Sequence, residues 1–396
     1  MITLTSEQEM LRRTAREFAE REIVPVVAQI EAAPHDAIVP WDLCQPLFTK
    51  GAELGFTSLL VPEAYGGLGL SCTELVLVME ELGAADVSIP ANYFNLTATL
   101  NLLVARAATD EQKQRLLAHL GEGRPMLFSG ALSEPNIAGS DLFCPTPDPS
   151  IGVQSAAHRQ GNEYIITGHK SAFVTNAGIA DAYFVMARTD FDVPVGQGMT
   201  MFYVPAETPG LSFGARTEMI GWKAAHHTEI YLDEVCVPAA NRIGEEGQAG
   251  QIFAGVPEVA IGLAACYVGL ARAAYELALD FARQRVSWGE PIIQHQAVAL
   301  KLADMMVDVQ SARLMVWDAA HAAEHDPFTA ATLKSPAAKT FAVDVAIRTA
   351  QKAVEILGGY GISKEYQAGK FLNDDWIGYS CDFTRDVLRL GMVDFL

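Results

Sequence analysis

The hydrophobic pattern of this chain changes its period twice, and the order of those changes restricts the fold more than any single motif. Residues 1–123 repeat apolar side chains at helical spacing, and Thr5 or Ser6 suits the start of the first helix. Residues 124–238 carry short β-rich runs separated by Gly, Pro and Asp. Long Ala-rich helical patterns then cover residues 252–283, 296–325 and 335–357. The sequence therefore predicts a mainly α, α+β fold: an N-terminal helical domain (1–123), a middle β domain (124–238) and a C-terminal four-helix bundle (239–396).

This order of elements excludes one common class of nucleotide-binding protein. A Rossmann domain alternates strands and helices and places a GxGxxG turn between its first strand and helix. Neither feature occurs here. A dinucleotide, if bound, must therefore be held by another fold.

The net charge and the cysteine spacing indicate which binding partners and which cellular compartment to expect. A formal net charge of −20 repels phosphate at long range, so we expect no binding to nucleic acid or to anionic membranes. No uninterrupted apolar run reaches about 18 residues, and we expect neither a membrane span nor a signal peptide. Six cysteines are scattered without CxxC spacing, which favours buried thiols in a reducing cytoplasm.

Six motifs follow one another in a fixed order along the chain. They occupy residues 61–69, 130–141, 173–177, 233–238, 282–291 with Gln296, and 355–361. In this order and spacing the chain resembles the acyl-CoA dehydrogenase superfamily over nearly its whole length. The resemblance implies noncovalently bound FAD, a homotetramer whose neighbouring subunit completes the dinucleotide site, and an electron-transfer flavoprotein as electron acceptor.

The resemblance also implies which residues contact the flavin half of FAD. Leu132 and Ser133 match the loop that faces the pyrimidine edge of the flavin, and Ser140 matches a pyrophosphate contact. Phe173 and Thr175 match the aromatic ring and the hydroxyl that flank the flavin, although one extra residue separates Lys170 from Phe173 here. Turn chemistry is the alternative interpretation of both serines. We also assign Thr384, near the C-terminal end of the sequence, to cofactor binding.

A second set of cofactor residues belongs to the adenosine and pyrophosphate end. By the same resemblance, a neighbouring subunit contributes Arg285, Ser287, Trp288, Gln296 and Gly359, with the guanidinium pairing with phosphate oxygens. A solvated cation at a helix end is the alternative for the arginine. Glu355 stands where the family usually has Gln, so its carboxylate must turn away, bond a ribose hydroxyl or be protonated.

Asp382 occupies the position of the catalytic base in the resembling enzymes, where most members carry Glu. Such a carboxylate removes the α-proton of an acyl thioester while the β-hydrogen leaves as hydride to flavin N5, and the N–H of Asp382 matches the oxyanion donor. The shorter side chain withdraws the carboxylate by about 1 Å, which predicts a different substrate shape. Dehydrogenases of cyclic acyl-CoA thioesters and nitroalkane oxidases also use Asp. The structural alternative is that Asp382 only caps the last helix.

The first bundle helix departs from the resembling enzymes. Many members have a Phe-Asp-x-x-Arg pattern there that binds the CoA arm, whereas this chain reads Val256-Pro257-Glu258-Val259 and lacks the arginine. Glu258 lies one position away from an alternative base site, and we do not assign it that role. His226 and His227 have no metal-ligand spacing around them, so we interpret both as loop residues and expect no metal site. We predict an FAD-dependent acyl-CoA dehydrogenase acting on a branched or cyclic acyl thioester, with CoA favoured over an acyl carrier protein. A nitroalkane-oxidase-type enzyme is the alternative.

Overall fold

The N-terminal part of the chain is helical, as predicted. The computed structural model describes residues 4–34, 37–138, 141 and 148–396. The helices here are α1 (Ser6–Phe18), η1 (Ala19–Ile23), α2 (Val24–Ala32), α3 (Pro40–Glu53), α4 (Cys72–Ala85), η3 (Pro90–Asn95), α5 (Leu96–Ala107), α6 (Asp110–Leu116) and α7 (Ala118–Gly121). Thr5 is the N-cap of α1, and it forms a reciprocal capping box with Gln8, which confirms the predicted start.

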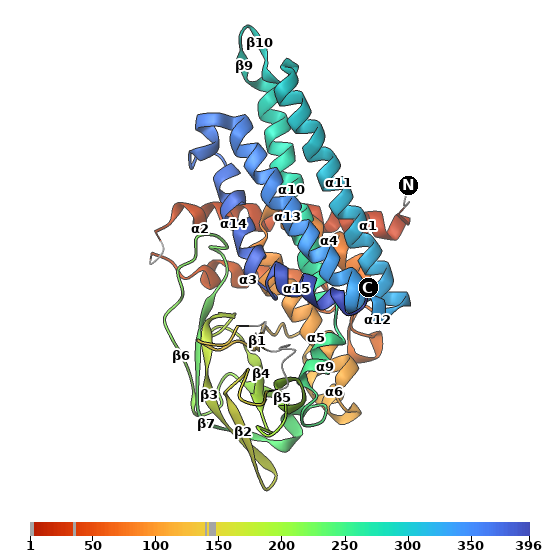
Figure 1. Cartoon of the computed structure of the whole chain (residues 1–396), viewed down its shortest axis with the longest axis vertical. Helices are drawn as coiled ribbons and strands as arrows, with labels where there is room; N and C mark the ends of the chain where they lie inside the picture. Colours follow the sequence, from red (N-terminus) through yellow and green to blue (C-terminus); the bar gives the residue numbers. More distant parts are fainter. Residues whose placement is uncertain (1–3, 35–36, 139–140, 142–147) are drawn as a thin grey trace.

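The middle of the chain forms one mixed sheet, which lies below α1 and α2 and beside α5 and α6 (Figure 1). Its strands are β1 (Phe128–Ala131), β2 (Ala156–Gln160), β3 (Glu163–Thr175), β4 (Ala182–Arg188), β5 (Met199–Pro205), β6 (Leu211–Phe213), β7 (His227–Pro238) and β8 (Arg242–Ile243). They run in the order β6-β7-β3-β2-β4-β5-β8, with β1 pairing with β4, and the short helix α8 (Val195–Gly198) precedes β5. Every residue of β4 is buried, because protein covers both faces of the sheet at this strand.

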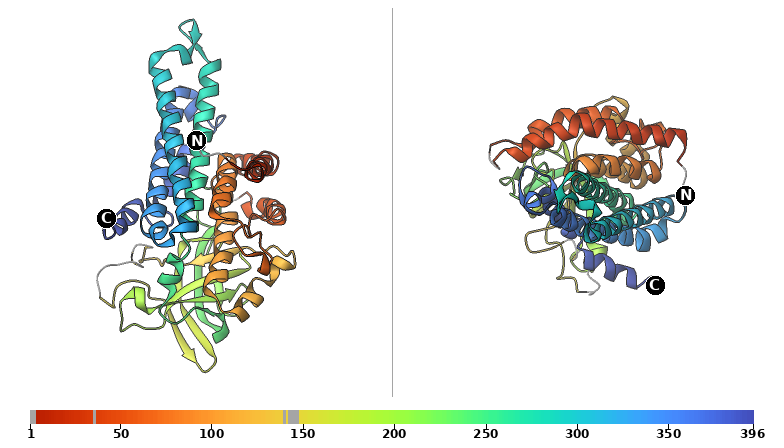
Figure 2. Two further views of the ribbon diagram at one scale, coloured as in Figure 1. Left: turned by 90° about the vertical axis from the view of Figure 1, so that its right-hand side faces the viewer. Right: turned by 90° about the horizontal axis from the view of Figure 1, so that it is seen from above.

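The C-terminal part is a helical bundle that extends well beyond the sheet (Figures 1 and 2). Its helices are α9 (Ala249–Ala254), α10 (Glu258–Gln284), α11 (Gln296–His325), α12 (Pro327–Thr329), α13 (Ser335–Leu357), α14 (Ala368–Ser380) and α15 (Arg385–Val393). The bounds of α11 and α13 confirm the predicted ranges 296–325 and 335–357. The predicted helix 252–283 is instead divided around Pro257 into α9 and α10. A hairpin of β9 (Val286–Ser287) and β10 (Glu290–Pro291) forms the tip.

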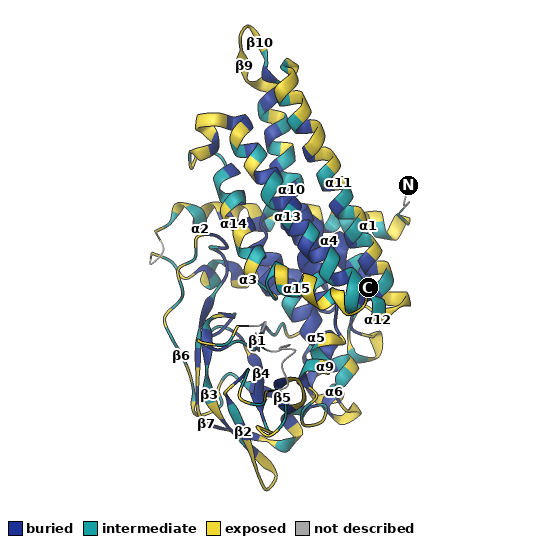
Figure 3. Cartoon of the chain, viewed as in Figure 1, coloured by how far each residue is buried: buried dark blue, intermediate teal, exposed yellow. Residues whose placement is uncertain are grey.

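The core lies where α4 of the N-terminal part crosses α10 of the bundle (Figure 3). Two glycines allow the helices to approach closely here. A Cβ on Gly83 would lie 2.4 Å from the carbonyl oxygen of Cys266, and a Cβ on Gly269 would lie 2.2 Å from that of Glu80. By length and composition α10 is also the one helix, among the described residues, that could cross a membrane. Of its most apolar stretch, 78% is buried inside the fold, as in a core helix.

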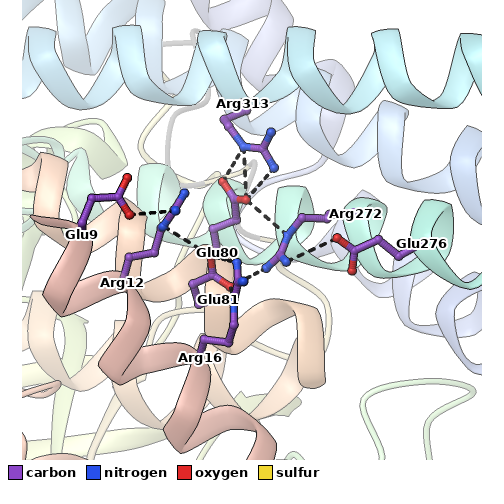
Figure 4. Close-up of polar contacts among 8 residues, drawn as sticks. All are labelled: Glu9, Arg12, Arg16, Glu80, Glu81, Arg272, Glu276 and Arg313. Atoms are coloured by element: carbon purple, nitrogen blue, oxygen red, sulfur yellow. Dashed lines mark hydrogen bonds and ion pairs between the residues drawn. The ribbon is translucent and has the colours of Figure 1, made fainter. Parts of the chain in front are cut away.

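A network of buried and half-buried charges crosses this contact (Figure 4). Glu80 of α4 accepts hydrogen bonds from Arg313 of α11 and lies 3.4 Å from Nε of Arg272 of α10. The neighbouring Glu81 binds Arg272 and also Arg16 of α1. Both carboxylates of α4 are therefore paired with arginines of other helices, namely α1, α10 and α11.

The predicted fold class is confirmed, while the domain boundaries at residues 123 and 238 stay a prediction.

Candidate active site

A cavity of about 990 Å³ lies between the sheet, η3 with α5, the start of α10 and the turn after α14. Its lining includes six of the predicted site residues, from three separate segments of the chain: Leu132, Ser133, Phe173, Thr175, Asp382 and Thr384. The remaining wall is largely apolar, with Leu96, Leu100, Phe253, Leu263 and Trp376 among its side chains. Its size is sufficient for a ring system together with an acyl chain.

Asp382 reaches this cavity from an unusual backbone turn. Helix α14 ends at Ser380, and Asp382 and Phe383 then both adopt left-handed conformations, with φ of 45° and 67°. Such values are costly for residues other than glycine. Thr384 then becomes the N-cap residue of α15. Its side chain makes no capping hydrogen bond, and Asp382 lies two residues earlier, so the interpretation of Asp382 as a helix cap is wrong.

The surroundings of Asp382 shift its pKa in a direction that suits a base. Its side chain is open to the cavity, but the protein atoms around it reduce its hydration, and this desolvation raises the pKa of Asp382 above the ordinary value. The Lys339 ammonium acts in the opposite direction and lowers this pKa. A carboxylate with a raised pKa is a better proton acceptor once it is ionised.

A buried ion pair holds the loop that contains Leu132 and Ser133. Lys170 of β3 donates to the carboxylate of Glu134 at 3.0 Å and to the carbonyl of Leu132 at 3.1 Å. Burial favours the neutral form of Glu134, but Lys170 and hydrogen bonds from Gln154 and Ser155 outweigh it and keep the pKa of Glu134 below its ordinary value. The Ser133 hydroxyl is bonded to that of Ser171 at 2.8 Å. These bonds hold the loop residues in place at the wall of the cavity.

The extra residue before Phe173 is accommodated in a β-bulge. The pairing of β3 with β7 shifts between Lys170 and Val174, so the chain swings out there and Phe173 stands exposed in the cavity wall. Two residues further on, the hydroxyl of Thr175 lies 3.2 Å from Nε2 of His227.

His227 is a cavity residue that the sequence analysis assigned wrongly to a loop. It begins β7, lies directly opposite Thr175 in the ladder, and lines the cavity. Burial lowers the pKa of His227 to about 4, so the ring is neutral at pH 7. Its place at the start of a β-rich run was the only available sequence signal.

A second, open cavity of about 590 Å³ lies at the tip of the bundle. Arg285 and Gly359 line it, together with Phe281, Leu357 and Tyr360. Of the other predicted adenosine-end residues, Ser287 is part of the tip hairpin, Trp288 is 94% exposed beside it, and Gln296 begins α11. Glu355 of α13 pairs with Lys301 of α11, and its assignment to the cofactor site stays a prediction.

Glu258 lies apart from these cavities, and Ser140 lies outside the described residues. Glu258 is buried and accepts two hydrogen bonds from Arg106, at 2.7 and 2.9 Å, and it does not line the central cavity. This pairing is consistent with our not assigning it as a base. Among the described residues no group of His, Cys, Asp and Glu has the arrangement of a metal site.

The residues that fit FAD lie in two separate places, the central cavity and the tip cavity. The central cavity offers hydroxyl and backbone groups beside an apolar slot, as a flavin ring requires. The tip cavity offers an arginine and a glycine turn, where Gly358 has φ of 58° and a Cβ on Gly359 would meet nothing within 4 Å, as a close approach of phosphates requires. In one chain the tip hairpin of β9 and β10 lies at one end of the bundle, and the sheet lies at the other end (Figure 1).

Comparisons with known proteins agree with this geometry. Descriptions of the N-terminal, middle and C-terminal domains of acyl-CoA dehydrogenase match residues 5–124, 129–235 and 254–378. The cyclohex-1-ene-1-carbonyl-CoA dehydrogenase of Syntrophus aciditrophicus is 32% identical, over 98% of this chain and 90% of that protein.

Two solved structures share the fold over nearly their whole length. Butyryl-CoA dehydrogenase from Megasphaera elsdenii has a TM-score of 0.90 and 32% identity, covering 100% of this chain and 99% of that one. A chain in a structure titled for the electron transferring flavoprotein of Acidaminococcus fermentans has a TM-score of 0.89 and 30% identity, covering 99% and 98%. All three domains, the fold and the cavity lead to one conclusion: this chain belongs to the acyl-CoA dehydrogenase family of FAD-dependent oxidoreductases.

Proposed function

We propose that this enzyme introduces a double bond between Cα and Cβ of an acyl thioester, with Asp382 as the base. One observation carries the proposal: Asp382 lines the same cavity as Leu132, Ser133, Phe173 and Thr175. The base and the predicted flavin contacts therefore surround one space, and a substrate in it meets both.

In this mechanism the side chain of Asp382 accepts the α-proton. The bound FAD supplies the acceptor for the β-hydrogen, which leaves with its bonding electron pair. The backbone N–H of Asp382 donates to the thioester oxygen and stabilises the negative charge that develops there. The apolar wall around Leu96, Leu263 and Trp376 holds the acyl group and excludes water from the reacting carbons.

We propose a branched or cyclic acyl group as the substrate, carried by CoA. An aspartate is one methylene shorter than a glutamate, so the α-carbon must lie closer to the turn than a straight-chain substrate brings it. The relative from Syntrophus aciditrophicus, which is named for a cyclic acyl-CoA, supports this choice. Among the described residues the cavity lining contains no Lys or Arg, so the CoA phosphates must lie outside it.

A second copy of the chain completes the cofactor site in this proposal, within a homotetramer. The tip cavity and the central cavity lie at different ends of the bundle, and FAD has to contact both sets of residues. Trp288 and Ile362 at the tip and Leu300 and Val307 on α11 are exposed apolar side chains that a neighbouring subunit would cover. Light scattering of the FAD-loaded protein tests the assembly, and a monomer that retains FAD contradicts it.

We propose an electron-transfer flavoprotein as the electron acceptor and the cytoplasm as the location. The similarity to a chain in the flavoprotein structure from Acidaminococcus fermentans supports the first. The described cysteines are all free thiols, which suits a reducing compartment. Reoxidation of the reduced enzyme by purified electron-transfer flavoprotein, compared with reoxidation by air, tests the acceptor.

The central test is anaerobic bleaching of the bound flavin. Straight-chain, branched and cyclic acyl-CoA thioesters are titrated in parallel with nitroalkanes, against wild-type protein and Asp382→Asn. We expect a branched or cyclic thioester to bleach the wild type, and the variant to bind FAD but stay oxidised. Bleaching by nitroalkanes alone, reversed by air with release of peroxide, would assign the oxidase reaction instead. An active Asp382→Asn variant would remove Asp382 from the mechanism.

A further inference from the structure

Lys339 is a buried lysine on α13 whose ammonium makes all its described hydrogen bonds to one segment. It is 1% exposed. Its Nζ donates to the carbonyls of Gly378 at 3.0 Å, Cys381 at 2.8 Å and Phe383 at 3.0 Å. The three donors of a lysine are thus fully used, and the three acceptors belong to the last turn of α14 and the turn after it.

The bonded segment is the one that has to be held in place. Asp382 and Phe383 adopt left-handed backbone conformations, which are unfavourable for a residue with a side chain. The carbonyls at a helix end also lack partners within the helix. Lys339 satisfies carbonyls on both sides of Asp382 and so stabilises a turn that is otherwise unfavourable.

The same helix fastens the segment a second time. Asp344, five residues after Lys339, binds Arg385 at 3.0 Å and Arg389 at 3.2 Å, and both arginines belong to α15. Helix α13 therefore holds the turn through Lys339 and the following helix through Asp344. A rigid support behind an active-site turn keeps its side chain within the small tolerance that catalysis allows.

We propose that Lys339 is a positioning residue, which holds the strained turn so that the Asp382 carboxylate is aimed into the cavity at the α-carbon of the substrate. This inference rests on the proposed function, in which Asp382 is the base. Lys339 does not line the cavity and touches neither substrate nor cofactor in this arrangement.

The charge of Lys339 has a second effect, which gives the inference a distinctive signature. Its ammonium lowers the pKa of Asp382 against the opposing effect of burial. Other titratable and charged groups around the turn and across the cavity are Cys381, Arg385, Arg389 and Asp344, with Glu134, Asp141, His227 and Glu229 on the opposite wall. Removing the ammonium should raise the pKa of Asp382, so that higher pH is needed to ionise the base.

The test compares Lys339→Met with Lys339→Arg and with Thr340→Val, all in the FAD-loaded protein. Methionine keeps the apolar stem of lysine but loses its hydrogen-bond donors and its charge. Arginine keeps the donors and the charge. Thr340 is the neighbouring buried residue, and its hydroxyl bonds only within its own helix. The measurements are FAD content, the pH dependence of the rate of flavin reduction, and hydrogen exchange of the peptide covering residues 378–384.

We expect Lys339→Met to reduce flavin about a hundredfold more slowly, the cost of a misplacement of about 1 Å, with KM changed less than about threefold. The acid limb of its pH profile should move to higher pH, and residues 378–384 should exchange faster. Lys339→Arg should restore the wild-type limb, and Thr340→Val should resemble wild type. If Lys339→Met does not fold, Lys339→Gln, which lacks the charge and keeps an amide donor, provides the comparison.

Two results separate this inference from the proposed function. If residues 378–384 exchange no faster than in Thr340→Val and the pH limb does not move, Lys339 does not position the turn. If exchange increases but Asp382→Asn still reduces its flavin, the support of the turn stands while the assignment of the base fails.

Discussion

Asp375 is a buried carboxylic acid that should make the stability of this protein depend on pH. It is 0% exposed, and neither of its carboxyl oxygens has a hydrogen-bond partner. Burial and, second, the neighbouring Asp374 raise the pKa of Asp375 well above the ordinary value of 3.8, although Lys370 opposes them. We therefore expect Asp375 to be protonated in the folded protein and ionised in the unfolded chain at neutral pH.

The sign and the size of the effect follow from this difference. Because the folded-state pKa is raised, the contribution of Asp375 to stability is fully present below about pH 4 and is lost as pH rises toward that pKa. The loss is about 1.4 kcal/mol per pH unit. The upper limit of this loss over the two pH units between pH 5 and pH 7 is about 3 kcal/mol, and Asp375→Asn removes it.

The assay is the thermal unfolding midpoint of wild type and Asp375→Asn, measured from pH 5 to pH 8 with FAD in excess. Replacing the carboxyl group by an amide also changes stability by an amount that does not depend on pH. The informative quantity is therefore how the difference between the two unfolding midpoints changes with pH. We expect the unfolding midpoint of the variant to rise relative to that of the wild type by about 3–4 °C between pH 5 and pH 7 at the upper limit. Asp386→Asn, at an exposed carboxylate of α15, is the control and should show a constant difference. A constant difference for Asp375→Asn as well would refute a neutral buried acid.

Three other substitutions test the contacts described above. Glu80→Gln weakens the pairing with Arg313 and Arg272, and should lower the free energy of unfolding in urea by about 3 kcal/mol; an unchanged value would assign the network no net role. Lys170→Met leaves Glu134 unpaired, and should lower FAD content and the unfolding midpoint, whereas Lys223→Met at a surface pair should change neither. Arg285→Ala should weaken FAD binding about 10- to 100-fold in a fluorescence titration, with flavin reduction unchanged at saturation; unaltered affinity would exclude Arg285 from the cofactor site.

Much of the fold was accessible from the sequence because helical and strand patterns are local. The ranges 296–325 and 335–357 correspond to α11 and α13 to the residue, and Thr5 was a correct helix start. The division of the predicted helix 252–283 around Pro257 was missed, because its apolar pattern continues through the break. The predicted flavin contacts came from the resemblance, and the structure places five of them in one cavity with Asp382.

The tertiary structure decided which residues far apart in the chain contact one another. Lys339 meets the carbonyl of Cys381 across 42 positions, Lys170 meets Glu134 across 36, and Thr175 meets His227 across 52. The sequence by itself determined the elements, the family resemblance and Asp382 as the candidate base. It did not show what supports that base or which histidine enters the cavity, because these pairings depend on how helices and strands pack, and periodicity along one segment carries no information about its distant partner.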